Sequence, residues 1–248
     1  MKTQLLFGAV TLLATSLLAA DAKDELKAAA KKLGDAGGYC WKATTELAGG
    51  GGGGGGGAMR PGPTEGKIAK DGTICLSMTR GDNTTEAFVK DGKGAIKTQD
   101  GWQSLADAMA AAGGGGGGGG QGNRGRFIAR TLQNYKAPAT DIADMADKAK
   151  ELKKEGEMVC GDLTEDGAKS LMSFGRGQGG NGPEISGAKG SVKVWLKDGL
   201  PVKYEYKVSG KMSFNGNDRD IDRTTTVEIK DVGGAKFDVP DDAKKKMS

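Results

Sequence analysis

The stretch PVKYEYKVSGKMSF (residues 201–214) alternates between apolar and polar side chains almost without a break. One face carries Val202, Tyr204, Tyr206, Val208, Met212 and Phe214, and the other carries Lys203, Glu205, Lys207, Ser209, Lys211 and Ser213. A period of two over this length is typical of a strand in an antiparallel sheet with one wet face and one apolar face. The stretch therefore predicts a two-faced antiparallel sheet.

The turn before this strand is predicted at Lys197-Asp198-Gly199, and the same three letters recur at residues 70–72 and 90–92. Asp-Gly between two alternating stretches is a strong hairpin signal. We expect a three-residue loop with Gly199 left-handed, because a two-residue loop would set apolar side chains against polar ones. This register pairs Val194 with Val202 and places Trp195 opposite Pro201.

The turn after the strand is predicted as a four-residue loop at residues 215–218. That loop pairs Met212 with Ile221 and Val208 with Thr225, so both hairpins share one apolar face. Gly210 interrupts the apolar row in the middle of the strand. A residue without a side chain at this place indicates a bend or a bulge, and hence a curved sheet.

The remaining chain reads as helix, strands, helices, strands. Helices are expected at residues 24–33, 126–135, 140–154 (with Thr140 as N-cap) and 164–174, and strands at residues 39–47 and in a meander between residues 64 and 102. Glycine-rich loops are expected at residues 49–57, 113–120 and 175–182, all within a single domain of residues 21–248. Strands that alternate exclude a doubly wound parallel sheet and favour an α+β fold, with helices covering one face of an antiparallel sheet.

Residues 1–20 have the pattern of a secretory signal peptide: a basic start, an apolar run and small residues at Ala19 and Ala20. The apolar run is shorter than the roughly 20 residues of a spanning helix, which disfavours a membrane anchor. The formal charge of +4 falls to +3 without this leader, which contains one lysine and no acid. So mild a charge does not favour nucleic acid. We therefore expect a soluble periplasmic or secreted protein.

Several kinds of chemistry are disfavoured by composition. The chain has no histidine, which removes Ser-His-Asp and Cys-His catalysis and histidine metal sites. The alternating Asp218, Asp220 and Asp222 lack the glycine and glutamate of a helical calcium loop, so no metal and no cofactor are expected. The three cysteines, Cys40, Cys75 and Cys160, have no CxxC spacing; in an oxidising compartment one disulfide and one leftover thiol are expected, with the pairing left open.

The element order resembles the LolA/LppX-like carriers of the bacterial envelope over nearly the whole mature chain. The most similar stretches are residues 161–165 running into Leu171, residues 191–210, and the Asp100-Gly101-Trp102 step that ends the first meander. The resemblance implies an incomplete, strongly curved β-barrel with an apolar concave side covered by helices. It also implies a protein that carries lipids or the acyl chains of lipoproteins, or senses them in the same place.

Two interpretations of the apolar face remain open: an ordinary filled core, or a groove for an apolar or amphipathic ligand. The groove candidates are Trp41, Ile74, Met78, Val194, Tyr204, Tyr206 and Val208. Met and aromatic side chains suit adaptable binding sites. The alternative to a non-catalytic lipid-binding protein is a module that binds another envelope protein through its edge strands or Trp195.

Overall fold

A computed structural model describes residues 10–48, 62–81, 83–111, 128–173, 184–214 and 217–247. Its strands are β1 (Gly38–Leu47), β2 (Thr64–Ala69), β3 (Ile74–Arg80), β4 (Asn83–Lys90), β5 (Lys93–Thr98), β6 (Gly101–Ser104), β7 (Ala149–Glu155), β8 (Met158–Leu163), β9 (Glu184–Lys197), β10 (Leu200–Phe214) and β11 (Asn217–Lys230). Its helices are α1 (Val10–Asp35), α2 (Leu105–Ala111), α4 (Pro138–Lys148), α5 (Glu165–Met172) and α6 (Asp241–Lys246), and residues 128–133 are also helical.

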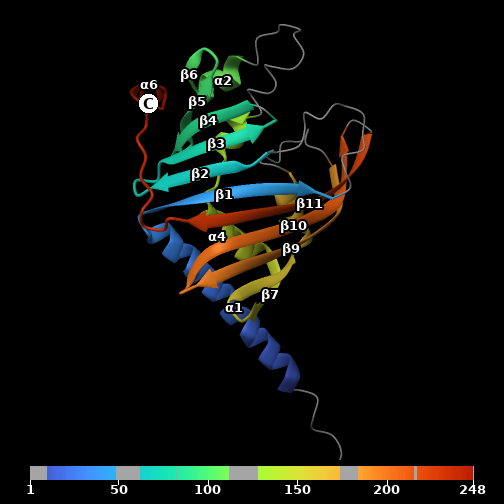
Figure 1. The fold of residues 1–248 in the computed structure, drawn as a ribbon. Coiled ribbons are helices and arrows are strands. Elements are labelled where there is room, and N and C mark those ends of the chain that lie inside the picture. The colour runs from blue at the N-terminus through green and yellow to red at the C-terminus, as the bar shows by residue number, and fades with distance from the viewer. Residues whose placement is uncertain are drawn as a thin grey trace, which may run out of the picture.

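The strands form one antiparallel sheet of 11 strands in the order β6-β5-β4-β3-β2-β1-β11-β10-β9-β8-β7. The two meanders meet where β1 pairs with β11, so the first and last strands of the chain lie side by side in the middle of the sheet (Figure 1). The sheet is not closed, because β6 and β7 do not pair with each other. The predicted class, an α+β fold built on a curved antiparallel half-barrel, is confirmed.

Helices α1, α4 and α5 pack on one face of the sheet, which we call the inner face. They share a single apolar core with β1, β3, β4, β5 and β7 to β11. The alternation of β10 fits this arrangement: Tyr204 and Val208 are 2% and 0% exposed, while Lys207 between them is exposed. The wet and apolar faces of this strand are therefore as predicted between Lys203 and Ser213, whereas Val202, which the alternation assigns to the apolar face, is 38% exposed.

The opposite, outer face carries a second small apolar cluster that the sequence does not reveal. Phe88 of β4 lies 5.3 Å from the ring of Trp102 and 6.1 Å from that of Phe237, and α6 adds Ala243. The segment after β11 thus crosses back over the outer face to β5 and β6 (Figure 1). Lys244 and Lys245 of α6 pair with Asp241 and Asp242 on the surface.

The predicted loop between β9 and β10 is wrong. Lys197 pairs with Leu200, which leaves a two-residue turn in which Asp198 and Gly199 have positive φ angles of 53° and 71°. A bulge at Val202 then restores the face of the strand, because Pro201 pairs with Leu196 whereas Lys203 pairs with Trp195. The extra residue of the bulge brings apolar side chains opposite one another, as the predicted three-residue loop would do.

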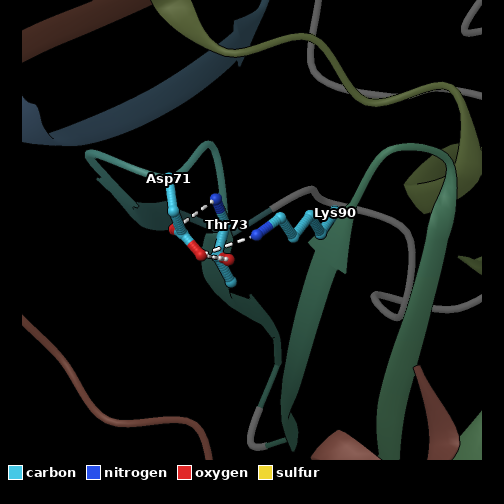
Figure 2. A network of polar contacts seen from close by, with 3 residues as sticks. All are labelled: Asp71, Thr73 and Lys90. Carbon is cyan, nitrogen blue, oxygen red and sulfur yellow. Dashed lines mark hydrogen bonds and ion pairs between the residues drawn. The ribbon is translucent and has the colours of Figure 1, made fainter. Parts of the chain in front are cut away.

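The expected three-residue loop occurs instead at Lys70-Asp71-Gly72, between β2 and β3. Ala69 and Thr73 bond across this loop, and Gly72 is left-handed with φ of 81°. Figure 2 shows why it is stable: the Asp71 carboxylate accepts bonds from the Thr73 N–H at 3.0 Å, the Thr73 hydroxyl at 2.9 Å and the Lys90 ammonium at 2.7 Å. These bonds, the one from Lys90 first, lower the pKa of Asp71 to about 2.

The register between β10 and β11 also differs from the prediction, by two residues. Phe214 pairs with Asn217, which leaves only residues 215 and 216 between the strands, and Val208 faces Arg223 rather than Thr225. A shift of two keeps every side chain on its face. The expected bend at Gly210 is confirmed, because the register with β9 is irregular between Ser209 and Lys211.

One predicted helix is too long. The helix expected at residues 140–154 begins at Pro138 and ends at Lys148, and β7 follows at once. Leu152 is the one buried residue of β7, so this edge strand shows no apolar alternation in the sequence. The helix expected at residues 164–174 is observed as α5, with the Thr164 side chain accepting a bond from the Gly167 N–H as its N-cap.

Helix α1 is continuous across the end of the predicted leader. From Asp21 onward it packs on the rest of the molecule: Leu26 and Leu33 are fully buried, and Lys23 and Lys27 both pair with Asp147 at the end of α4. Cleavage after residue 20 stays a prediction. The glycine-rich loops expected at residues 49–57, 113–120 and 175–182 lie outside the described residues.

Candidate functional site

The inner face of the sheet changes character along its strands. On β1, Tyr39 and Trp41 are 1% and 3% exposed, and Leu47 at the far end is 44% exposed. On β3, Leu76 is fully buried whereas Met78, two residues on, is half-buried. One end of the inner face is thus covered by protein, and side chains at the other end, on the right in Figure 1, keep contact with solvent.

The covered end, which we call the sealed end, is closed by polar bonds as well as by packing. Trp41 Nε1 donates to the Tyr135 hydroxyl at 3.0 Å, and the two rings stack at 6.2 Å. The Ala139 N–H of α4 donates to the Tyr39 hydroxyl at 3.1 Å. These bonds attach the inner face to the segment between residues 135 and 139, which leads into α4.

Tyr204 completes the sealed end, with its hydroxyl donating to Asp141 Oδ2 of α4 at 3.3 Å. Burial raises the pKa of Asp141 to about 6, although the Tyr204 bond acts in the opposite direction. Burial also raises the pKa of Tyr39 to about 12 and that of Tyr204 well above its usual value. The phenols are therefore neutral bond partners at any physiological pH.

A glycine allows the Trp41 ring to lie flat on the sheet. Gly66 of β2 pairs with Trp41, and a Cβ atom at this position would lie 2.1 Å from ring atoms of the tryptophan. No side chain fits beneath the ring without displacing it. Packing at the sealed end therefore depends on the fit between neighbouring residues of β1 and β2, in addition to the contacts with α4.

At the other end we define the half-buried set as Met78, Leu171, Ile185, Tyr206 and Ile221. All five pack against the main core yet keep partial exposure. They come from β3, α5, β9, β10 and β11, so segments far apart in sequence supply them. Apolar side chains with free surface on the inner face of a half-barrel can contact an apolar ligand without rearranging the core.

The seven groove candidates all belong to this inner face but divide between its two ends. Five of them are buried, with exposures of 3% for Trp41, 8% for Ile74, 0% for Val194, 2% for Tyr204 and 0% for Val208. Met78 and Tyr206 are half-buried and belong to the half-buried set. The structure therefore brings the seven onto one face and places two of them where a ligand could make contact.

Arg223 is a buried residue of this region that the sequence analysis missed. It lies on β11 between Thr225 and Ile221 on the inner face, is 2% exposed, and donates from Nη2 to the Leu171 carbonyl oxygen of α5. Burial lowers the pKa of the guanidinium, partly offset by the nearby Tyr206. Its signal in the sequence is a basic residue at an apolar position of the alternation.

The three cysteines are free thiols, so the disulfide expected from their count is not formed. Cys40 and Cys75 both pair with Lys67 of β2, which places them two strands apart, about 10 Å. Disulfides need Cα atoms within about 7 Å. Cys160 of β8 is separated from β1 by β9, β10 and β11. Burial raises the pKa of each thiol, which makes it a weak nucleophile at neutral pH.

In the part of the chain that the structure describes, no group of three His, Cys, Asp or Glu could hold a metal ion. Two of the alternating aspartates have lysine partners: Asp222 pairs with Lys207 at 3.2 Å and Asp218 with Lys211 at 3.8 Å. A search of the described helices finds none with the length and apolar character that crossing a membrane requires.

Two surface features were candidates for binding another protein: Trp195 and the edge strands. The ring of Trp195 is covered by a lysine side chain, and the edge strand β7 carries charged side chains. Trp195 lies opposite Lys203 rather than Pro201, and the lysine ammonium sits 4.6 Å from the centre of its ring. The edge strand β7 presents Lys150, Glu151, Lys153 and Lys154 to solvent. Charged side chains on an edge strand oppose the addition of another strand.

Comparison with known proteins was made for sequence and for structure. No protein-family model matches the chain, and no curated protein does. The structure is similar to that of LprF from Mycobacterium bovis, with 10% identity, a TM-score of 0.46, and coverage of 90% of this chain and 98% of LprF. It is also similar to that of the lipoprotein LppX from Mycobacterium tuberculosis, with 10% identity, a TM-score of 0.37, and coverage of 93% and 99%.

Proposed function

We propose that the protein is an exported, soluble and non-catalytic binding protein that holds an apolar or amphipathic ligand, such as a lipid or an acyl chain. The ligand lies against the half-buried set at the open end of the inner face. Its partners are thus a lipid or the acyl chain of a lipoprotein, and neither nucleic acid nor a cofactor takes part. The mechanism is sequestration by burial, without bond breaking.

The observation that supports this proposal is the uneven covering of the inner face. A protein that needed its core only for stability would gain by covering Met78, Tyr206 and Ile221 as completely as Tyr204. Each apolar side chain that a ligand covers contributes roughly 25 cal/mol per Å² of buried surface. Methionine and isoleucine adapt to ligands of irregular shape, and the tyrosine adds a polar contact.

The alternative, a platform for another envelope protein, has less support. The ring of Trp195 is already covered by Lys203, and the charged side chains of β7 oppose the addition of another strand. The absence of histidine and the raised pKa values of the three thiols also disfavour an enzyme that works through a general base or a cysteine.

Native mass spectrometry after mild extraction from the producing cell tests the proposal, together with titration by a fluorescent fatty acyl probe. We expect a co-purified lipid mass or saturable binding of the probe. Tyr206→Ser and Met78→Ser should each weaken the probe's affinity about tenfold. The matched control is Val202→Ser, since Val202 is 38% exposed at the opposite end of β10. A delipidated protein that neither contains lipid nor binds the probe would contradict the proposal.

A further inference from the structure

The sealed end contains a carboxyl group, Asp141, among aromatic side chains. Its Oδ2 accepts a hydrogen bond from the Tyr204 hydroxyl at 3.3 Å, and the next residue of α4, Ile142, is fully buried. The phenols of Tyr39 and Tyr135 lie close enough for its charge to act on them. A carboxylate in such surroundings gives up water, and burying an ionised group is costly unless other bonds compensate for the loss.

The charges around Asp141 do not compensate for its burial. Lys136 and Lys148 favour the ionised form, but Lys136 pairs with Asp144, whose own charge opposes ionisation. Helices α1 and α5 and strand β7 also pack on α4. Lysines on these elements pair with other acids: Lys23 and Lys27 with Asp147, Lys169 with Glu165, and Lys154 with Glu25. Burial therefore dominates and raises the pKa of Asp141 to about 6.

The start of α4 is held to the sheet less firmly than the rest of the helix. Its N-cap residue, Ala137, has no side-chain oxygen that could accept a bond from the first turn. The bonds that attach this part to the sheet are those of the Ala139 N–H and the Trp41 indole N–H, together with that of Asp141. Ile142 and Met145, farther along, are 0% and 1% exposed. The segment of residues 135–141 can thus come away while the remainder of α4 stays packed.

We propose that residues 135–141 form a proton-operated switch, which stays on the sheet while Asp141 is protonated and comes away when Asp141 ionises. In the detached state the carboxylate regains water, and the bonds of Tyr39, Trp41 and Tyr204 to this segment are broken. The sealed end of the inner face is then open to solvent. This inference is independent of the proposed function, because the switch lies at the end opposite the half-buried set.

The direction of the pH effect follows from the two states of Asp141. Its pKa is about 6 when the segment lies on the sheet and returns toward 3.8 once the carboxyl group is in water. At low pH both states hold the proton, and the attached state is favoured. As the pH rises toward 6, the detached state loses its proton first. The ratio of detached to attached protein should therefore rise about 50-fold between pH 4 and pH 7.

Hydrogen exchange of the full chain, followed by NMR at pH 4 and pH 7, tests the switch. The Ala139 N–H and the Trp41 indole N–H are the reporters, because each donates a bond that detachment breaks. The amide of Val194, a fully buried residue of β9, reports unfolding of the sheet. After correction for intrinsic exchange, we expect the protection of both reporters to fall about 50-fold from pH 4 to pH 7. At pH 7 both should exchange faster than Val194.

Three variants separate the switch from a general loosening of the helix. Asp141→Asn cannot ionise and should remove the pH dependence. Tyr204→Phe removes a bond that favours the ionised form, so the upper end of the transition should move to higher pH. Asp144→Asn is the matched control on the same helix. It should keep the transition, with the upper end slightly lower, because the charge of Asp144 raises the pKa of Asp141.

Several results would overturn the proposal. Equal exchange of Ala139 and Val194 at both pH values would mean that the segment opens only when the whole sheet unfolds. Protection of the reporters that does not depend on pH, or a pH dependence that persists in Asp141→Asn, would exclude this carboxyl group as the switch. The wild-type comparison needs no variant, so the inference stays testable even if a variant does not fold.

Discussion

Tyr204 and Tyr206 stand two residues apart on the same face of the same strand, yet their surroundings differ. Tyr204 is 2% exposed and bonds to Asp141 of α4, whereas Tyr206 is half-buried and pairs with Thr225 beside a buried arginine. The segments around α4 bury Tyr39, Trp41 and Tyr204 at one end of the inner face, whereas the half-buried set at the other end keeps partial exposure. One apolar face therefore serves two roles: the sealed end holds the fold together, and the half-buried end is left for a ligand.

The largest expected effect comes from truncating the two tyrosines in turn. Tyr204→Ala should lower the free energy of unfolding by about 3–5 kcal/mol, because it leaves a cavity in a packed core and an unsatisfied Asp141. Tyr206→Ala should cost less, about 1–2 kcal/mol, since Tyr206 already keeps partial exposure in the folded protein. Urea unfolding followed by circular dichroism measures both. Equal losses would remove the distinction between the two ends.

Gly66→Ala tests the packing of the sealed end by overfilling it. The new methyl group would meet the Trp41 ring, where the Cβ position lies 2.1 Å from ring atoms. We expect a loss of about 2–3 kcal/mol in thermal or urea unfolding. Gly34→Ala is the control, because its Cβ would lie 3.8 Å from Ala139 in ordinary contact. It should be neutral or slightly stabilising within helix α1. If Gly66→Ala left the unfolding free energy unchanged, Trp41 would not lie where the structure places it.

Asp141→Asn tests the sealed end through the pH dependence of the unfolding free energy. The pKa of Asp141 is raised from 3.8 to about 6, so the folded protein holds a proton that the unfolded chain releases between these values. Stability therefore falls as the pH rises through this window, and the charged carboxylate costs about 3 kcal/mol above pH 6. The variant keeps an oxygen for Tyr204 and cannot ionise. It should be more stable than the wild-type protein by about 3 kcal/mol at pH 8 and not at pH 4. A constant difference between pH 4 and 8 would refute the raised pKa.

The smallest effect is expected at Asp71, in a network outside both ends of the inner face. Asp71→Ala removes the bonds from Thr73 and Lys90 that Figure 2 shows, but the turn is exposed to water. The loss should stay below about 1 kcal/mol, as for other surface networks. Ligand affinity should not change. A larger loss in urea unfolding would mean that the β2–β3 turn, rather than the sealed end, limits stability.

The faces of the strands could be predicted from the sequence, but their registers could not. In β10, alternation alone assigns Tyr204 and Val208 inward and Lys207 outward. The register depends on the length of the loop between two strands. The same Lys-Asp-Gly sequence forms a three-residue loop at Asp71 but contributes to a two-residue turn at Asp198, so the sequence does not determine the loop length. The β9–β10 register stayed consistent with the faces through the bulge at Val202, and the β10–β11 error of two residues changed partners but no face.

Contacts between distant parts of the chain were beyond prediction. Strand β7 has a single buried residue, Leu152, so its sequence predicts a continuation of the preceding helix, and its pairing with β8 is visible only in the structure. The bond of the Tyr39 hydroxyl with Ala139 joins residues 100 positions apart, and no local sequence pattern predicts it. The division of the groove candidates into sealed and half-buried residues depends on such contacts, as the bond of Tyr204 with Asp141 of α4 shows.

The most direct test of the account is a titration of the protein, labelled with ¹³C at its methionine methyl groups, with oleate in an NMR spectrometer. Met78 belongs to the half-buried set, and Met145 of α4 is 1% exposed at the sealed end. We expect the Met78 resonance to shift in a saturable manner while that of Met145 stays in place. A saturable shift at Met145 without one at Met78, or no shift at either, would contradict a binding site at the half-buried end of the inner face.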